Sequence, residues 1–561
     1  MLYKPSFSKS AQDILKDRYY WKDSDGNPAE TAEQMLLRIA NHVAGAEKNE
    51  TLRTKWADEY YNEMAQLNFL PNSPTIMNAG RPAPHGQLAA CFVIGIEDTM
   101  DGICEALRKQ MLIHKSGGGT GFNFSKLRYE GARVNSTNGR ASGPISFMSL
   151  FDKATDTVQQ GGMRRGANMG ILNIDHHDIR KFIHCKDADG VITNFNISVG
   201  MSDEFMQKVA DNPDGEEAAL LAEIAESAWR TGDPGILFMD AINRDNPTPN
   251  LGPLECTNPC GESPLYANEA CNLGSINLAK MVKNGTFDYA ALRRVTAVAT
   301  RFLDSVIDVN QYPLPEISES VRKTRKIGLG IMGWADTLFQ LRIAYDSDEA
   351  RALADKIMGT IHEEAIRVSE ALGVEKGIPA DLKHLNRRNA TLTCIAPTGT
   401  IALLADASSG IEPLFALEHT RLRTLTDGTK VSMKQKNRYY EEALNEGLSE
   451  NELKKVFVTS HDVAPSGHIK MQGIFQKHVD LAVSKTINLV NSATIQDVLD
   501  SYVLAWKEGC KGITVYRDGS KSFQVLYTDA QKAEADRQRT SAEKVPVPAG
   551  KPSLKLKLKK A

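Results

Sequence analysis

The chain has 561 residues, of which 41% are hydrophobic and 24% charged, and its formal net charge at pH 7 is -3. This balance suits a soluble globular protein and gives no bias toward nucleic acid or an anionic membrane surface. The first twenty residues are charged throughout and lack an apolar core, which excludes a secretory signal. The longest uncharged stretch, residues 390–405, is too short to span a bilayer. We therefore expect a cytoplasmic protein without a membrane segment or a direct nucleic-acid partner.

Residues 1–66 are predicted to form an N-terminal helical region. Thr31 and Gln34 have the spacing of a helix capping box, in which each side chain bonds the backbone of the other residue. The apolar residues that follow recur at helical spacing, and they are Met35, Leu36, Ile39 and Val43.

Residues 67–525 are predicted to form one α/β domain. Short apolar runs, such as 90–96 and 196–201, are separated by glycine-rich connectors at 114–125 and 159–170. Helical patterns and one further short run follow at 286–375, 391–405 and 434–511. Strands mixed with helices in this way are typical of α/β proteins. The last residues, 526–561, are polar and end with five lysines in eleven positions, which predicts a flexible basic tail.

Eight cysteines are spread along the chain without the paired CxxC motifs of a structural zinc site, so no metal site is expected. Most cysteines of this kind are small buried apolar residues. We interpret four of them in this way: Cys104, Cys185, Cys394 and Cys510.

Three motifs resemble known sites but lack part of the pattern. Residues 327–333 fit GxGxxG, but the segment before them, VRKTRK, is not an apolar strand, so we attribute these glycines to close helix packing. The GGGTG of residues 117–121 lacks the Lys-Ser/Thr of a P-loop. Residues 361–365 have only the first histidine of HExxH.

The two glycine-rich connectors, 114–125 and 159–170, still favour a nucleotide site. Glycines let backbone N–H groups approach anions and flat bases, and one connector also carries Arg164 and Arg165. In PTGTIALL, residues 397–404, backbone N–H groups precede an apolar helical run and can face a phosphate. An ordinary capped helix would explain that segment alone. Together with NSPT at residues 72–75, a nucleotide site explains it better.

Residues 258–262, NPCGE, hold a thiol on a defined turn, because Cys260 lies between a rigid proline and a permissive glycine. A thiolate nucleophile needs a nearby cation, and Glu262 has the opposite effect. A disulfide exchanger needs a partner thiol, such as Cys271. A radical enzyme needs a thiol as hydrogen-atom carrier and a carboxylate as general base. The residues alone leave these three chemistries open.

Eight motifs, in one order between Leu67 and Ser520, resemble the catalytic subunit of ribonucleotide reductases, most closely the adenosylcobalamin-dependent class II enzymes. The motifs are NSPTIMNAG, LAACFVIGIEDTM, HKSGGGTGFNFS, QQGGMRRGA, NPCGE with CNLGSINL, RKIGLGIMGWAD, APTGTIALLADASSGIEP and GCKGITVYRDGS. Each motif alone is weak, but eight in series are specific. The resemblance implies a ten-stranded α/β barrel with Cys260 on a finger loop inside it.

The resemblance also implies a role for each matching residue in deoxyribonucleotide synthesis. Cys260 would hold a thiyl radical, sheltered by burial, and abstract the 3′ hydrogen of a ribonucleotide. Glu262 would take the 3′-hydroxyl proton, and Asn258 would bond near the sugar hydroxyls. Cys91 and Cys271 would supply the reducing equivalents and end as a disulfide.

Binding residues are implied in the same way. Substrate phosphates are expected at or near Thr75, Ala90, Gly119, Pro397, Thr398, Gly399, Thr400 and Ile401. A deoxynucleotide specificity effector is expected near Asp98 and Arg128, at the interface of a homodimer. The loop with Arg164 and Arg165 is expected to report the identity of the effector to the substrate base.

Two departures from the family pattern concern regulation and electron supply. Only about sixty residues precede the core, too few for an ATP-cone, so activity regulation by ATP and dATP is not expected. No cysteine follows Cys510, whereas the class II pattern usually ends in a cysteine-rich tail. Either an external thioredoxin-like dithiol protein reduces Cys91 and Cys271 directly, or the chain is shortened or divergent.

Adenosylcobalamin is the expected radical source, because only Tyr516 occurs where class I subunits have two adjacent tyrosines. Arg180 replaces the glycine of a DxHxxG-like segment, so no histidine-ligating cobalamin module is present, and class II enzymes do without one. A class I-like subunit that needs a separate metal-containing partner is the first alternative. A non-catalytic nucleotide-binding homologue and a plain dithiol oxidoreductase are the others. The dithiol oxidoreductase leaves the phosphate loops unexplained.

Overall fold

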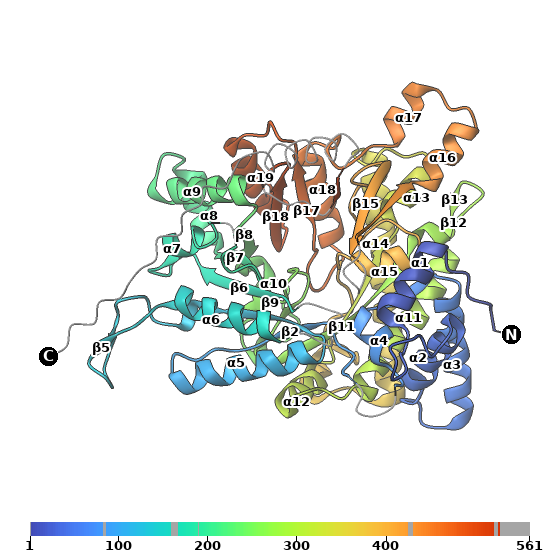
Figure 1. The fold of residues 1–561 in the computed structure, drawn as a ribbon, viewed down its shortest axis with the longest axis horizontal. Helices are drawn as coiled ribbons and strands as arrows, with labels where there is room; N and C mark the ends of the chain where they lie inside the picture. Colours follow the sequence, from blue (N-terminus) through green and yellow to red (C-terminus); the bar gives the residue numbers. More distant parts are fainter. Residues whose placement is uncertain are drawn as a thin grey trace, which may run out of the picture.

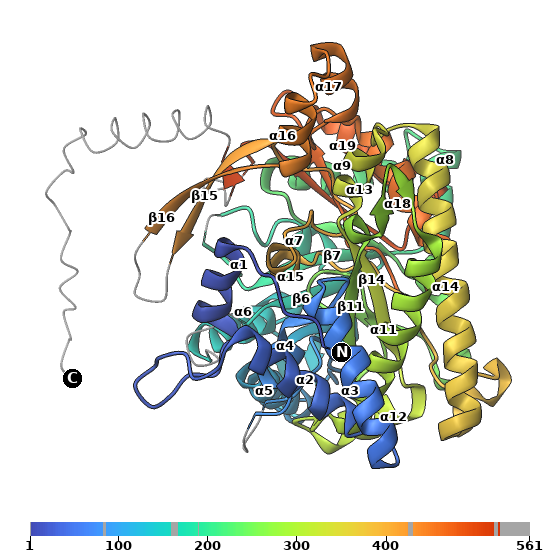
Figure 2. The ribbon, with the colours of Figure 1, turned by 90° about the vertical axis from the view of Figure 1, so that its right-hand side faces the viewer.

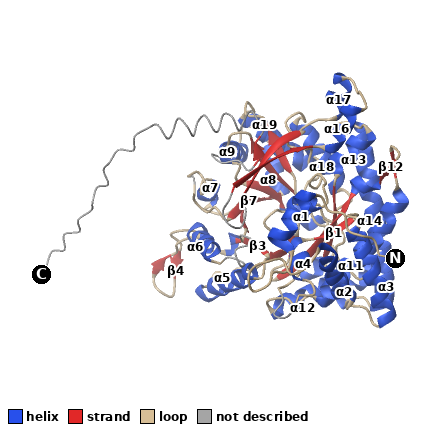
Figure 3. Cartoon of the chain, turned by 45° about the vertical axis from the view of Figure 1, so that its right-hand side comes forward, coloured by secondary structure: helices blue, strands red, loops and turns tan. Residues whose placement is uncertain are grey.

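The computed structural model describes residues 2–81, 86–158, 166–188, 190–424, 430–520 and 526–527. Its main sheet has ten strands: β1 (Phe69–Pro71), β2 (Cys91–Val93), β3 (Gly119–Asn123), β6 (Asn168–Asn173), β7 (Phe195–Met201), β8 (Gly235–Phe238), β11 (Glu269–Asn277), β14 (Ile327–Met332), β17 (Thr486–Leu489) and β18 (Gly512–Arg517). Their order is β1-β11-β2-β3-β6-β7-β8-β18-β17, with β14 also paired to β11. Figure 3 shows strands in the interior with helices around them.

The long strand β11 organises this sheet. One half of β11 pairs antiparallel with β2, the other half pairs antiparallel with β1, and its second edge pairs parallel with β14. Successive neighbours from β2 to β8 are parallel. Isolated bridges join Leu329 to Thr393 and Ile395 to Val483, just before β17, so they connect the two ends of the sheet. The predicted ten-stranded α/β barrel is confirmed.

The N-terminal helices pack on one side of the barrel. They are α1 (Lys9–Ile14), a π-helical turn η1 (Leu15–Tyr19), α2 (Ala32–Ala44), α3 (Glu50–Ala65) and α4 (Ser73–Asn78). The predicted capping box at Thr31 and Gln34 is present, and the apolar residues predicted after it are buried: Met35, Leu36, Ile39 and Val43. In Figure 1 these helices, in blue, gather beside α11 (Tyr289–Val309), against which α2 and α3 pack.

The remaining helices surround the strands. They are α5 (Met100–Lys115), α6 (Pro144–Thr157), α7 (Ile179–Ile183), α8 (Asp203–Asp211), α9 (Glu216–Thr231), α10 (Met239–Arg244), α12 (Pro315–Thr324), α13 (Trp334–Leu341), α14 (Asp348–Lys376), α15 (Gly399–Leu404), α16 (Arg438–Asn445), α17 (Glu450–Val456), α18 (Pro465–Gln476) and α19 (Ile495–Lys507). Figure 2 shows α14, the long yellow helix, on the outside next to α11. Within the described residues, no helix combines the length and apolar character that a bilayer crossing needs.

Short elements complete the fold. The 3-10 turns are η2 (Phe124–Lys126), η3 (Pro249–Leu251), η4 (Leu278–Met281) and η5 (Ala380–Leu385). The hairpins are β4 (Arg133–Val134) with β5 (Gly139–Arg140), β12 (Val282–Lys283) with β13 (Thr286–Phe287), and β15 (Glu418–Thr424) with β16 (Lys430–Lys436). Of the predicted tail, 526–561, the structure describes only β19 (Leu526–Tyr527), which pairs with β15.

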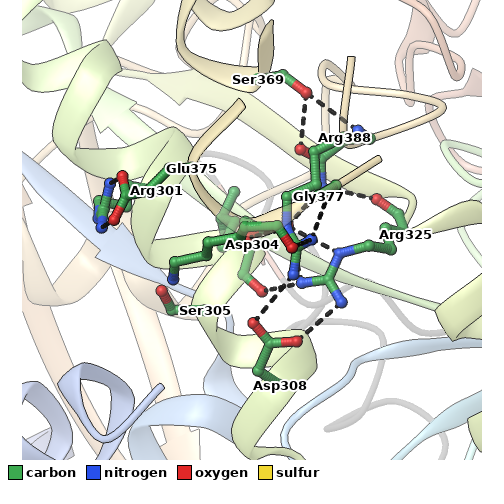
Figure 4. A network of polar contacts seen from close by, with 12 residues as sticks. Arg301, Asp304, Ser305, Asp308, Arg325, Ser369, Glu375, Gly377 and Arg388 are labelled. Carbon is green, nitrogen blue, oxygen red and sulfur yellow. Dashed lines mark hydrogen bonds and ion pairs between the residues drawn. The ribbon is translucent and has the colours of Figure 1, made fainter. Parts of the chain in front are cut away.

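A buried ionic network ties α11 to the start of β14. Asp304 accepts hydrogen bonds from Arg325 at 2.8 Å, Arg388 at 2.9 Å and Asn389 at 3.0 Å (Figure 4). Burial opposes the charged carboxylate, but the two guanidinium groups hold the pKa of Asp304 below its usual value. The network therefore fixes the chain just before Lys326, whose side chain forms a buried ion pair with Glu269 of β11 at 2.8 Å.

Two interpretations that were made from the sequence are wrong. The glycines at 327–333 do not serve helix packing, because Gly328 and Gly330 lie in strand β14. A Cβ on Gly330 would come 2.3 Å from the carbonyl oxygen of Cys394, so the glycine allows close approach of neighbouring chain segments. Of the four cysteines expected to be buried, Cys104 is exposed and Cys185 is half-buried.

Candidate active site

The NPCGE segment forms the tip of a small hairpin. Its strands are β9 (Cys256–Thr257) and β10 (Pro264–Leu265), which pair antiparallel. Gly261 has φ +83° and its N–H bonds the carbonyl of Asn258 at 3.1 Å, so the turn needs a residue without Cβ at this position.

Glycines of strand β3 allow the hairpin to lie against the barrel wall. A Cβ on Gly121 would come 1.7 Å from the carbonyl oxygen of Thr257, and a Cβ on Gly119 would come 2.9 Å from Pro259. On another side, Asn196 of β7 donates a hydrogen bond to the carbonyl of Pro259 at 2.8 Å. These contacts place the predicted finger loop against the inner face of β3 and β7.

The hairpin side chains meet a thiol of strand β2. The amide of Asn258 donates to Cys91 Sγ at 3.2 Å, and Cys91 Sγ donates to Glu262 Oε1 at 3.8 Å. Asn258 is oriented by the N–H of Ser263, which bonds its Oδ1 at 3.0 Å, and the N–H of Ala482 bonds the carbonyl of Glu262 at 2.9 Å. Asn258, Glu262 and Cys91 are therefore one buried, hydrogen-bonded group.

Cys91 and Cys271 lie directly opposite each other on β2 and β11. Opposed residues of an antiparallel pair have Cβ atoms about 5 Å apart, which is within reach of a disulfide after small adjustments. Burial raises the pKa of both thiols, and Glu262 adds to this effect at Cys91. Cys271 Sγ also donates to the carbonyl of Lys326 at 3.5 Å. Both side chains are therefore neutral thiols, and they lie directly opposite each other.

A first cavity of about 300 Å³ opens on one side of the hairpin tip. Its lining includes most residues that the sequence analysis assigned to catalysis and phosphate binding: Ala90, Cys91, Gly119, Asn258, Cys260, Glu262, Pro397, Thr398, Gly399, Thr400 and Ile401. The segment 397–401 leads into helix α15, as the sequence predicted. The cavity therefore joins the thiol group to the predicted phosphate loop.

A second cavity of about 540 Å³ lies on the other side of the same hairpin. It shares Pro259, Cys260 and Pro397 with the first cavity. Its other walls come from β6, β7, β8, β17 and β18, and include Lys485 and Tyr516. Cys260 can therefore be reached from two separate spaces.

Burial of Cys260 was expected, and this expectation is wrong. Cys260 is exposed, whereas Cys91 and Cys271 are buried. The reason is its place at the hairpin tip, where it borders both cavities. Its exposure is consistent with a thiol that must contact other molecules.

Other predicted residues lie outside the two cavity linings. Thr75 is buried on α4, and its hydroxyl donates to Asn72 Oδ1 at 2.6 Å and to the carbonyl of Leu88 at 2.9 Å. Asp98 and Arg128 are brought together as an ion pair of 2.7 Å. Arg164 and Arg165 lie outside the described residues.

The N-terminal region forms a part of the first cavity that was not predicted from the sequence. Arg18 and Tyr19 of η1 and Ser73 of α4 line the cavity. Ser73 stands in the NSPT motif, next to the Thr75 that was chosen instead. Arg18 lies in no recognised motif, so no sequence signal indicated it.

Comparison with known proteins gives the family. Residues 89–217, 215–384 and 380–516 match the family described as ribonucleotide reductase, barrel domain, and residues 5–84 match ribonucleotide reductase, all-alpha domain. The chain belongs to the ribonucleotide reductase family. The family expected from the sequence motifs is confirmed.

Two relatives and one solved structure show how close the likeness is. The chain is 41% identical to a protein of Thermoplasma acidophilum over 96% of this chain and 82% of that protein. It is 43% identical to a protein of Mycobacterium tuberculosis over 94% of this chain and 82% of that protein. Both are named vitamin B12-dependent ribonucleoside-diphosphate reductase. The α subunit of the Actinobacillus ureae class Id ribonucleotide reductase has the same fold, with a TM-score of 0.78, 24% identity, and coverage of 92% of this chain and 99% of that one.

Proposed function

We propose that this chain reduces ribonucleotides to 2′-deoxyribonucleotides by radical chemistry at Cys260, and so makes precursors for DNA synthesis. One observation carries the proposal: Cys260 lies at a hairpin tip between two cavities, beside a register-matched pair of thiols. A simple dithiol exchanger has no need of a second cavity at a third thiol.

The side chains of the first cavity support a defined role for each group. Cys260 would take the 3′ hydrogen atom of the ribose and return a hydrogen atom after reduction. Glu262 would accept the 3′-hydroxyl proton as general base, and Asn258 would orient the sugar hydroxyls. Cys91 and Cys271 would give two hydrogen atoms and become a disulfide. The balance is one ribonucleotide and two thiols converted to one deoxyribonucleotide, one disulfide and one water.

The second cavity would receive the part of a radical-generating cofactor that faces Cys260. Its volume of about 540 Å³ leaves room for that part beside the thiol, while the rest of so large a cofactor would extend beyond the cavity. Polar side chains that would hold the cofactor line its walls: Ser198, Lys485, Thr486, Asn488, Thr514 and Tyr516. Adenosylcobalamin, when bound, supplies the radical chemistry that a thiol does not start alone. The names of the two relatives support this cofactor over a separate metal-containing subunit.

Substrate, effector and partners follow from the same group of residues. Substrate phosphates would bind the segment 397–401, with Ala90 and Gly119 beside the sugar and Thr75 supporting the wall from behind. A deoxynucleotide effector would bind near Asp98 and Arg128. Arg164 and Arg165 would carry the effector signal to the substrate base.

Assembly and electron supply complete the proposal. Three apolar side chains on α5 and α6 are exposed, Met100 by 63%, Leu150 by 47% and Met111 by 39%, and they would lie in a homodimer interface. A thioredoxin-like dithiol protein would reduce the disulfide through Cys91, which borders the first cavity. Thiol chemistry of this kind suits the reducing cytoplasm, which remains the expected location.

The test is formation of deoxynucleotides from ribonucleoside diphosphates and triphosphates with adenosylcobalamin, dithiothreitol and a deoxynucleotide effector. We expect turnover by the natural chain and none by Cys260→Ser. The matched control is Cys104→Ser, which changes an exposed thiol on α5 and should keep full activity. Turnover only with an added metal-containing subunit would support the class I-like alternative. Nucleotide binding without turnover under either condition would support a non-catalytic homologue.

A further inference from the structure

The first cavity has an uneven charge distribution. Among the described residues that line it, Arg18 is the one basic side chain and Glu262 the one acidic side chain. Glu262 is 3% exposed, whereas the side chain of Arg18 is 48% exposed. The negative group therefore lies at the floor of the cavity, on the hairpin of Cys260, and the positive group lies at its mouth.

The backbone that carries Arg18 is held in place from two sides. The hydroxyls of Tyr19 and Ser73 share a hydrogen bond of 2.7 Å, and Arg81 donates to the carbonyl of Tyr19 at 2.9 Å. Before the π-helical turn, Ser8 donates to Asp406 at 2.7 Å, just beyond helix α15. Helix α1 also packs against α15, so this segment runs beside the proposed phosphate loop. Turns of the π type are frequent at functional sites.

The guanidinium of Arg18 is engaged only weakly by its neighbour. Its Nε lies 3.7 Å from Asp17 Oδ2, and an exposed ion pair of this length contributes little. A guanidinium offers a planar fork of donors that matches two oxygens of one phosphate. In the proposed function the ribose lies against Cys260 and Glu262 and its 5′ phosphates lie at residues 397–401, which line the same cavity as Arg18.

We infer that Arg18 binds the terminal phosphate of a ribonucleoside diphosphate and makes this site prefer diphosphates to monophosphates. This inference rests on the proposed function, because it uses the orientation of the ribose at Cys260. Arg18 is a specificity-determining residue in this arrangement and does not touch the reacting atoms.

The experiment compares CDP and CMP with four forms of the full chain: the natural protein, Arg18→Gln, Arg18→Lys and Lys16→Gln. Lys16 is an exposed residue on the same turn and does not line the cavity, so Lys16→Gln removes the same charge nearby. Equilibrium dialysis gives Kd for each nucleotide without turnover, and the reductase assay gives KM and kcat for CDP.

For Arg18→Gln we expect Kd and KM for CDP to rise about 10-fold, the size of one charge-assisted hydrogen bond partly exposed to water. In the same variant, kcat should stay within about twofold of the natural value, and the Kd for CMP should not change. Arg18→Lys should recover part of the loss, and Lys16→Gln should behave as the natural protein.

Unchanged CDP binding in Arg18→Gln overturns the inference, and so does an equal loss for CDP and CMP or an equal loss in Lys16→Gln. Failure of the proposed function gives a different result, namely no deoxynucleotide from the natural protein. The dialysis comparison still decides the role of Arg18 in that case.

Discussion

The thiol of Cys260 and the thiols of Cys91 and Cys271 are built into the fold in opposite ways. Cys260 stands at the tip of a hairpin with two-residue strands and is exposed to two cavities. Cys91 and Cys271 are buried on adjoining strands of the ten-stranded sheet, directly opposite each other. Cys260 is accessible to other molecules, whereas Cys91 and Cys271 are held at a fixed separation by the pairing of their strands.

The difference matches the role proposed for each thiol. A thiol that exchanges hydrogen atoms with a substrate must be reachable by it, and a radical started in one cavity must serve the other. Two thiols that end as a disulfide need a fixed separation, which adjoining strands supply. The hairpin connects the two requirements, because Asn258 and Glu262 contact Cys91.

The largest expected effect comes from breaking the thiol pair. Without dithiothreitol, the natural protein should form about one deoxynucleotide per chain and lose two free thiols, since the oxidation of one thiol pair to a disulfide supplies two electrons. Cys91→Ser and Cys271→Ser should form no deoxynucleotide by this route, and their thiol content should stay constant. Product would be measured by chromatography and thiols by a colorimetric reagent.

Cys104→Ser serves as the control for the loss of a thiol in general, and it should match the natural protein. Repeated turnover by Cys271→Ser with dithiothreitol alone would contradict a role for the strand-paired thiols. A loss of folding in either variant would show as a changed circular dichroism spectrum and would exclude that variant from the comparison.

A smaller effect is expected from displacing the hairpin while leaving every thiol in place. In Gly121→Ala the new Cβ would lie 1.7 Å from the carbonyl oxygen of Thr257, so the hairpin must move. A displacement of about 1 Å in a reacting group costs roughly 10²-fold in rate. We expect kcat to fall by this factor and the thermal midpoint to fall by a few degrees, because the new methyl group overpacks the site, as measured by turnover and calorimetry.

The matched control is Gly359→Ala in helix α14. There the nearest atom to the new Cβ is His478 Cε1 at 3.3 Å, and alanine favours the helix. This variant should keep its activity. Full activity in Gly121→Ala would mean that the seating of the hairpin on β3 does not position Cys260.

Sequence reasoning predicted features that depend on local chemistry or on motif order. The capping box at Thr31 is a local pattern, and it was found as expected. The barrel and the NPCGE turn were expected from motifs that resemble a family. Sequence alone did not reveal the exposure of Cys260, because exposure depends on the cavities that distant strands create around the turn.

Two further differences between the sequence predictions and the structure also come from contacts between distant parts of the chain. The glycines of β3 were interpreted as a loop for anions, but Gly121 makes room for a hairpin that comes more than a hundred residues later. Arg18 reaches the cavity because the N-terminal segment folds back against α4 and α15. Such long-range packing has no local pattern, so residues that act through it were missed.

The smallest expected effect is the contribution of the buried pair to the pH dependence of stability. Burial raises the pKa of Cys91 and of Cys271, while an unfolded thiol titrates near pH 8.5, about the usual value. Above that pH the unfolded chain releases protons that the folded chain keeps. The contribution of these two thiols to the free energy of unfolding should therefore be constant below about pH 8.5 and fall as the pH rises toward the folded pKa, by at most about 1.4 kcal/mol per pH unit for each thiol.

Urea unfolding of the reduced protein from pH 7.5 to 10 measures this slope. Cys271→Ala should unfold more easily at every pH, because it leaves a small cavity, but its slope above pH 8.5 should be smaller by one thiol. Cys104→Ala, which removes an exposed thiol, should leave the slope of the natural protein nearly unchanged. Equal slopes for Cys271→Ala and the natural protein would mean that Cys271 is not held in its neutral form by the fold. The contrast between an accessible thiol and a sheltered pair would then rest on geometry alone.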